Sequence, residues 1–243
     1  MIWLLALNMA YVLAILAPEY PHVSPNHFSA LGNSANTALE LERELGLRRK
    51  IGPFLTPTFE NFIGSPMGAI PKKRSNPVKW RIIHDLSWPV GHSNNDGIPK
   101  DLFSCTYDTL DTAIAYLKSF VQGALMSKLD LSDAFRHILV HPAAWELPGS
   151  TSAVEINDTT TVAYFVDAYL QFGLHSSPAL FLKFAGTMAD VMHYRGVLHV
   201  WHYLDEVMWP PEPDTLCLTN LQGMILVSPL SQRKLSVLAL DWS

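Results

Sequence analysis

Two adjacent carboxylates, Asp205 and Glu206, stand in the apolar and aromatic stretch VLHVWHYLDEVMW at residues 197–209. Adjacent buried acids repel each other and lose hydration, so a fold keeps them only beside a positive charge. A third acid, Asp130, lies near the end of the apolar segment ALMSKLDL. If these segments are neighbouring strands, the three carboxylates converge into a site for hard divalent cations, foremost Mg²⁺. Two such ions about 4 Å apart stabilise an in-line phosphoryl displacement.

One concentrated basic stretch, PKKRSNPVKWR, has the chemistry of the substrate side of such a reaction. It contains Lys72, Lys73, Arg74, Lys79 and Arg81, five of the seventeen basic residues of the chain. Cations beside an acidic metal site suit a substrate that carries several phosphates. Taken alone, the same run is typical of a solvated basic loop, so the phosphate interpretation depends on its pairing with the carboxylates.

Other interpretations of the polar residues stay open. Asp205 and Glu206 are also acceptable in a polar turn on the surface, because turns favour acids. The histidines His193, His199 and His202 raise the question of zinc, but their spacing fits neither a zinc finger nor an H-E-x-x-H helix. We therefore interpret these histidines as packed residues.

The hydrophobic periodicity predicts the elements that position these residues. We expect helices over 36–50, 108–123 and 177–196, the last begun by Ser177 and Pro178. We expect strands over 80–86, 124–131, 136–142 and 159–170, and a hairpin with arms at 197–203 and 207–209. The tail at 214–243 is expected to hold one helix and a short strand. This order predicts an α+β sheet of the split βαβ kind with helices on one side.

Composition limits the class of protein. A chain of 243 residues with 49% hydrophobic residues can bury a core, as one large domain or two small lobes. A net charge of −5 argues against a general nucleic-acid coat protein but leaves room for a local basic groove. Two lone cysteines, Cys105 and Cys217, predict reduced thiols in the cytoplasm or nucleus.

The first seventeen residues, MIWLLALNMAYVLAILA, carry no charge. The run is as long as the shortest membrane spans and lacks the basic start of a signal peptide. A membrane anchor, a buried helix and a misassigned reading-frame start all remain open. A membrane-tethered interaction protein is therefore one alternative function, and it rests on this segment alone.

At residues 35–230 the chain resembles the fingers and palm of reverse transcriptases. The resemblance is carried in order by SPMGAIPKK, WRIIHDLS, LDLSDAF, YLQFGLHSSPALF and HYLDE. The residue sequences of these motifs, together with GHSNNDGI and LSDAFRHILVHP, are most similar to those of DIRS-type retrotransposons. These elements pair this polymerase with a tyrosine recombinase. The resemblance implies a right-hand polymerase fold with a ferredoxin-like palm. It also implies an apolar segment and linker (1–34), a fingers-like part (35–104), a palm with the metal site (105–230) and a degenerate or truncated tail (231–243) in which the thumb is absent or truncated.

The resemblance also assigns roles to matching residues. Asp130, Asp205 and Glu206 would be catalytic metal ligands, with Leu131 lending a backbone carbonyl. Phe135 would exclude a ribose 2′-hydroxyl and so favour deoxynucleotides. Further roles cover the incoming nucleotide and the template–primer. Nucleotide binding would involve Lys72, Lys73, Arg81, Phe172 and Gly173, and the template–primer would meet Tyr203, Ser177 and Pro178.

The expected function is RNA-directed DNA polymerisation, in which two Mg²⁺ ions, or Mn²⁺, assist the addition of deoxynucleotides to a primer 3′-hydroxyl. Expected partners are the RNA or DNA template–primer and deoxynucleoside triphosphates, with ribonuclease H and recombinase domains encoded nearby. Glu206 stands where the family has aspartate. The extra methylene moves the carboxylate by about 1 Å, so we expect impaired activity. Gln171 stands where many relatives have proline, and we expect little effect. The alternative function is an inactive retroelement relic or a co-opted nucleic-acid-binding protein.

Overall fold

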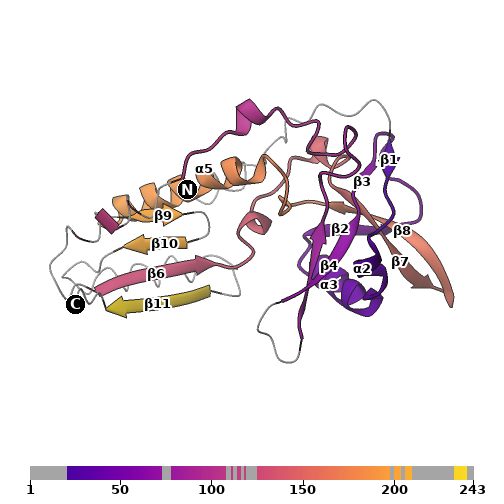
Figure 1. Ribbon diagram of the computed structural model, residues 1–243, viewed down its shortest axis with the longest axis horizontal. Coiled ribbons are helices and arrows are strands. Elements are labelled where there is room, and N and C mark those ends of the chain that lie inside the picture. The colour runs from indigo at the N-terminus through magenta and orange to yellow at the C-terminus, as the bar shows by residue number, and fades with distance from the viewer. Residues whose placement is uncertain are drawn as a thin grey trace. The chain divides into compact units, whose positions relative to one another are not determined.

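A computed structural model describes the chain at residues 21–72, 78–107, 111, 114–115, 118, 125–197, 200–203, 206–209 and 233–239. The chain divides into two compact units (Figure 1). The first unit comprises Met1–Phe103 with Phe135–Ser177, and the second comprises Ser104–Ala134 with Pro178–Ser243. The functional division into a fingers-like part at 35–104 and a palm at 105–230 stays a prediction.

The first unit is built on a five-stranded mixed sheet with the order β1–β3–β7–β8–β2. In that order the strands are His22–Val23, Ile63–Gly64, Gly149–Ile156, Thr159–Asp167 and Lys50–Phe54. Strands β1, β3 and β7 run parallel, whereas β8 pairs antiparallel with both β7 and β2. A separate hairpin pairs β4 (Met67–Pro71) with β5 (Trp80–His84).

Two helices, α2 (Phe28–Leu31) and α3 (Ser34–Gly46), belong to the same unit. In α3, Leu41 is buried and packs with Ala163 and Phe165 of β8 in one hydrophobic cluster. Removing an apolar side chain of this size from water contributes about 1.5–3 kcal/mol, which fixes the helix to the sheet. The 3₁₀ helices are η1 (Lys100–Phe103), η2 (Ala134–His137) and η3 (Pro142–Ala144).

The second unit contains a four-stranded antiparallel sheet with the order β11–β6–β10–β9. Its strands, in that order, are Arg233–Ala239, Leu125–Leu131, Glu206–Trp209 and Trp201–Tyr203. Helix α5 (Ser177–Tyr194) belongs to this unit from Pro178 onward. Along α5 the buried residues Phe181, Ala185 and Ala189 recur every four positions, which is the helical period.

Most sequence-predicted elements are confirmed. The structure contains a helix at Ser34–Gly46, strands β5, β6 and β8, the helix at Ser177–Tyr194, the β9–β10 hairpin and a strand in the tail. Most of the predicted helix over 108–123 lies outside the described residues, as does the tail helix. The predicted strand over 136–142 is wrong, because residues 134–137 form η2 and the segment has isolated bridge positions at Leu139 and Val140, with Leu139 bridged to Tyr169, instead of a ladder. Ile138 and Val140 are buried while Leu139 is exposed, so the alternating pattern was real but no ladder accompanies it.

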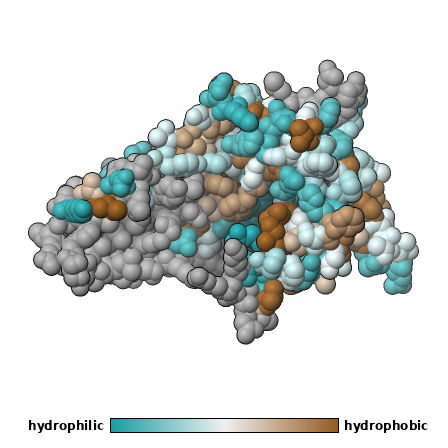
Figure 2. Space-filling model, viewed as in Figure 1, coloured by the Kyte–Doolittle hydropathy of each residue, from teal (hydrophilic) through white to brown (hydrophobic). Residues whose placement is uncertain are grey.

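Apolar surface in the described part of the chain occurs as separate residues among polar ones on the face drawn in Figure 2. The most exposed large hydrophobic side chain is that of Phe28, at 92%. Isolated apolar residues of this kind are normal on protein surfaces. Among the described residues, no helix has the length and apolar character needed to cross a bilayer, and segment 1–17 lies outside them.

Candidate functional site

Two of the acids singled out by the sequence lie on paired strands of the second unit. Asp130, at the penultimate position of β6, lies opposite Glu206, the first residue of β10. Opposed residues of an antiparallel pair have Cβ atoms about 4.5–5.5 Å apart. Glu206 also pairs with Tyr203 across the β9–β10 hairpin, so the two-residue connection between them carries Asp205. Asp205 itself lies outside the described residues.

Leu131, the expected backbone-carbonyl ligand, follows Asp130 and is 3% exposed. It pairs with Arg233 of β11, so the segment predicted to be a degenerate tail adds a strand beside the acids. No cluster of three or more metal-binding side chains occurs among the described residues, and the predicted site includes Asp205, which lies outside them. Magnesium binding therefore stays a prediction, as do the roles of these residues.

The basic residues lie on the β4–β5 hairpin of the first unit. Ile70 pairs with Arg81, and the Lys72 amide donates to the Lys79 carbonyl oxygen at 2.7 Å. Because side chains alternate across a strand and register partners share a face, Lys72, Lys79 and Arg81 project from the same face of the hairpin. Lys73 and Arg74 lie outside the described residues. The hairpin thus presents at least three positive charges on one side.

Two of the predicted nucleotide-pocket residues are in contact. The rings of Phe135 and Phe172 have centroids 4.9 Å apart and an interplanar angle of 44°. Phe172 remains 51% exposed, and Phe135 is half-buried. Gly173 follows with φ +95°, a conformation that glycine adopts without strain. The pair therefore presents an exposed aromatic surface beside the turn at Gly173.

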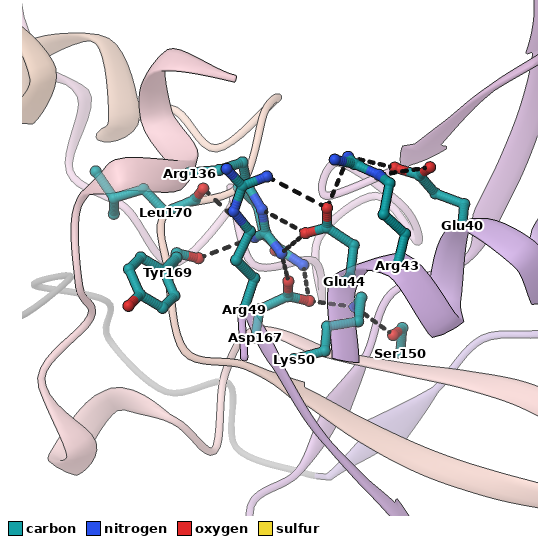
Figure 3. Close-up of polar contacts among 11 residues, drawn as sticks. Glu40, Arg43, Glu44, Arg49, Lys50, Arg136, Ser150, Asp167, Tyr169 and Leu170 are labelled. Atoms are coloured by element: carbon teal, nitrogen blue, oxygen red, sulfur yellow. Dashed lines mark hydrogen bonds and ion pairs between the residues drawn. The ribbon is translucent and has the colours of Figure 1, made fainter. Parts of the chain in front are cut away.

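Arg136, which follows Phe135 in the chain, belongs to a buried ionic cluster that the sequence did not reveal (Figure 3). The Arg136 guanidinium donates from Nε and Nη2 to Glu44 Oε2 at 3.1 and 2.6 Å, and Nη2 lies 2.6 Å from Asp167 Oδ1. Its Nη1 donates to the Tyr169 carbonyl oxygen at 3.1 Å. Arg136 is 8% exposed and Asp167 is fully buried. A guanidinium held at three of its nitrogens fixes the backbone beside Phe135.

The second carboxylate oxygen of Asp167 is held by Lys50 and Gln171. Lys50 lies opposite Asp167 in the β2–β8 ladder, and its ammonium donates to Asp167 Oδ2 and, at 2.9 Å, to Ser150 Oγ. Gln171 Nε2 donates to the same Asp167 oxygen at 2.6 Å. Gln171 is 2% exposed, so the residue expected to be a departure of little effect is a buried part of the cluster.

Burial acts differently on the charged groups of this cluster: it lowers the pKa of Lys50, although Asp167 opposes this. Burial alone would raise the pKa of Asp167, but Lys50 and Arg136 lower it below its ordinary range. Burial also opposes the charge of Arg136, while Asp167 and Glu44 raise its pKa above the usual value. Nearby, burial and the charge of Lys50 lower the pKa of His84 to about 3, so this imidazole is neutral at pH 7. Asp167 and Arg136 therefore compensate each other's buried charge.

Ser177, predicted to begin a helix at the template, is fully buried at the first position of α5. Its hydroxyl donates to the Gln171 carbonyl oxygen at 2.8 Å. Pro178 follows it, as is common at helix starts. These contacts tie the start of the helix to the turn that carries Phe172 and Gly173, and contact with a template stays a prediction.

These features belong to an α+β fold of the reverse-transcriptase kind. No family model and no curated protein matches the chain. Among solved structures, it is similar to the native protease–reverse transcriptase of prototype foamy virus, with a TM-score of 0.58 and 17% identity over 88% of this chain and 24% of that one. It is also similar to a foamy viral protease–reverse transcriptase in complex with double-stranded DNA, with a TM-score of 0.60 and 17% identity over 89% of this chain and 33% of that one. The chain thus spans about a quarter to a third of these structures, and the likeness establishes the fold alone.

Proposed function

We propose that this chain is the RNA-directed DNA polymerase domain of a retroelement. The observation that carries the proposal is the β6–β10 register, which sets Asp130 opposite Glu206 in a fold of the reverse-transcriptase kind. Acidic oxygens at opposed positions, with Asp205 in the adjoining hairpin connection, match the oxygen ligands that Mg²⁺ or Mn²⁺ prefers. We assign metal binding to Asp130, Asp205, Glu206 and the Leu131 carbonyl.

The proposed reaction is attack of a primer 3′-hydroxyl on the α-phosphorus of a deoxynucleoside triphosphate. One P–O bond forms to the primer, the bond to the β-phosphate oxygen breaks, and pyrophosphate leaves. When bound, two metal ions stabilise the charge that develops on the attacking and leaving oxygens. The protein's own contribution is positioning and charge neutralisation.

In this proposal the cations of the β4–β5 hairpin, Lys72 and Arg81, neutralise the triphosphate, together with Lys73. The Phe135 ring excludes a ribose 2′-hydroxyl by steric clash, and Phe172 and Gly173 form the adjoining wall. Tyr203, Ser177 and Pro178 serve the template–primer. That a related foamy viral enzyme has been solved with double-stranded DNA supports nucleic acid as the partner. The residue sequences of the motifs further favour a retrotransposon of the DIRS type, with ribonuclease H and recombinase domains encoded nearby.

Primer extension tests the proposal. The wild-type chain should extend a DNA primer on an RNA template with Mg²⁺ or Mn²⁺, and Asp130→Asn and Asp205→Asn should each abolish extension. Asp190→Asn, which removes an exposed carboxylate from α5, is the matched control and should leave the rate unchanged. Equal trace activity in the wild type and Asp205→Asn would contradict the proposal.

Glu206 also favours a second candidate, an inactive relic that keeps the fold and binds nucleic acid. A glutamate directly in the β6–β10 ladder places its carboxylate about 1 Å further from the backbone than an aspartate would. Titration calorimetry with Mg²⁺ and a deoxynucleoside triphosphate separates the two candidates. Binding of both supports the polymerase, whereas binding of a primer–template without either supports the relic.

A further inference from the structure

Asn95, in the loop that joins β5 to η1, is a buried residue whose two polar side-chain atoms both make hydrogen bonds. It is 4% exposed. Its Nδ2 donates to the Gly173 carbonyl oxygen at 2.8 Å and to Ser87 Oγ at 2.9 Å. Its Oδ1 accepts from the His175 amide at 2.8 Å. One amide side chain therefore binds the backbone on both sides of Leu174, about eighty positions further along the chain.

The loop around Asn95 is itself held in a fixed conformation. The Asn95 amide donates to the Leu86 carbonyl oxygen at 2.9 Å. Asp96 Oδ2 accepts from the Gly91 amide at 2.7 Å and from the Ser93 hydroxyl at 2.6 Å. Because hydrogen bonds fix the loop, the Asn95 side chain can hold a second segment of the chain in place, which a side chain on a mobile loop could not do.

The segment held by Asn95 is the turn that carries Phe172 and Gly173. The exposed Phe172 ring rests against Phe135, and its direction is set by the backbone of the turn. On the preceding side, Gln171 is tied to Asp167 and accepts the Ser177 hydroxyl through its carbonyl oxygen. On the following side, among the described contacts, Asn95 supplies both side-chain hydrogen bonds to Gly173 and His175.

We propose that Asn95 is a positioning residue for the Phe172–Gly173 wall of the nucleotide pocket, and that it thereby sharpens selection of deoxynucleotides over ribonucleotides. The inference rests on the proposed polymerase function. Without the Asn95 amide, two buried backbone groups lose their partners and the turn relaxes to recover them. The rings of Phe172 and Phe135 then shift relative to each other, and the sugar is held less closely.

The neighbouring residue Asn94 provides a matched control. It is fully buried in the same loop, and its Nδ2 donates to Ser65 Oγ at 3.0 Å rather than to the turn. Asn94→Ala and Asn95→Ala each delete a buried amide from the loop, so both lower stability. Only the Asn95 change removes the ties to Gly173 and His175.

The experiment compares Asn95→Ala, Asn95→Asp and Asn94→Ala in primer extension with deoxynucleotides and with ribonucleotides. Asn95→Asp keeps an acceptor for the His175 amide and loses the donor to Gly173, so it serves if Asn95→Ala does not fold. For both Asn95 variants we expect the KM for deoxynucleotides to rise about tenfold, with kcat within about twofold, and the preference over ribonucleotides to fall. Asn94→Ala should change neither. Equal KM and selectivity in the Asn94 and Asn95 variants would overturn the inference.

A second measurement separates this inference from the proposed reaction. Equilibrium binding of a deoxynucleoside triphosphate, followed by calorimetry, does not require turnover. If the wild type binds the nucleotide but extends no primer, the polymerase proposal fails and the Asn95 inference is still decided by the affinity of Asn95→Asp relative to Asn94→Ala. A wild type that binds no nucleotide overturns both.

Discussion

Asp130 and Glu206 occupy directly opposed positions on β6 and β10. The ladder fixes both backbones, so the length of each side chain decides where its carboxylate lies. Shortening Glu206 to aspartate draws the carboxylate back by about 1 Å without moving the strand. If the proposed reaction is correct, this change gives the aspartate that the resemblance to reverse transcriptases predicts at this position and relieves the expected impairment.

We therefore predict that Glu206→Asp raises the single-turnover rate of primer extension by roughly 10- to 100-fold, the range that a displacement of this size costs. Glu42→Asp, the same change at an exposed position of α3, should leave the rate within about twofold. A lower rate in Glu206→Asp would show that the longer side chain is the one suited to this site.

The buried ionic cluster predicts a large effect of Arg136 on stability. Arg136→Met removes one buried counter-charge from both Glu44 and Asp167, while Lys50 still pairs with Asp167. Breaking a buried ion pair in this way costs about 3–5 kcal/mol in the free energy of unfolding, measured by urea denaturation. Arg43→Met removes a partner of Glu44 from a side chain that is 43% exposed, and it should cost under about 1 kcal/mol. Similar losses in the two variants would mean that the cluster is more solvated than its burial implies.

The residues of this cluster could not be predicted from the sequence to pair with one another. Helix α3, strands β6 and β8, helix α5 and the β9–β10 hairpin follow from local periodicity and turn chemistry. Glu44, Arg136 and Asp167 come from distant parts of the chain, and nothing in their local sequence specifies that they pair. Gln171 was interpreted as a minor departure because its buried partner, Asp167, is known only from the fold.

The pairing of Asp130 with Glu206 was more predictable, and for a physical reason. Asp130 lies near the end of an apolar segment and Glu206 near a hairpin turn, so pairing of the two strands sets the two acids opposite each other. The segment at 136–142 shows the opposite case. Its alternating burial is that of a strand, but a ladder also needs a partner strand, and a single sequence does not reveal whether one is available.

Because of His84, the free energy of unfolding should depend on pH in the acid range. Burial, followed by Lys50 and Arg136, lowers its folded pKa to about 3, whereas Asp167 opposes this. The His84 imidazole therefore binds a proton near pH 6.5 in the unfolded chain but stays neutral in the folded chain. The free energy of unfolding consequently falls as the pH decreases from 6.5 towards 3. Asp167 has a lowered pKa as well, so its contribution is present above about pH 4 and is lost only below it.

Between pH 6.5 and pH 4 the free energy of unfolding should thus fall by on the order of 2 kcal/mol because of His84. The measurement is urea denaturation of the wild type and His84→Gln across this range. The difference between the two curves cancels the other histidines. A difference that stays constant with pH would show that His84 is protonated in the folded protein.

The shared face of the β4–β5 hairpin predicts that Lys79 acts together with Arg81 and Lys72. Lys79→Gln and Arg81→Gln should each raise the KM for a deoxynucleoside triphosphate by about 3- to 10-fold, and the effect should shrink at high salt. Lys183→Gln removes an exposed lysine from α5 and serves as the control, with no change expected. An effect of Lys79→Gln no larger than that of Lys183→Gln would exclude Lys79 from phosphate binding.

Two glycines should respond to alanine with opposite signs. A Cβ added at Gly149, where β7 meets β3, would lie 2.3 Å from Phe62 Cζ and 2.5 Å from the Ile63 carbonyl oxygen. Phe62 is 1% exposed and cannot move aside, so Gly149→Ala should lower the free energy of unfolding by about 3 kcal/mol. At Gly186, inside α5, a Cβ meets no atom of the described residues within 4 Å, and alanine should add about 0.5–1 kcal/mol by its higher helix propensity. Urea denaturation of both variants measures the two effects, and a stabilising Gly149→Ala would contradict the close packing of β7 on Phe62.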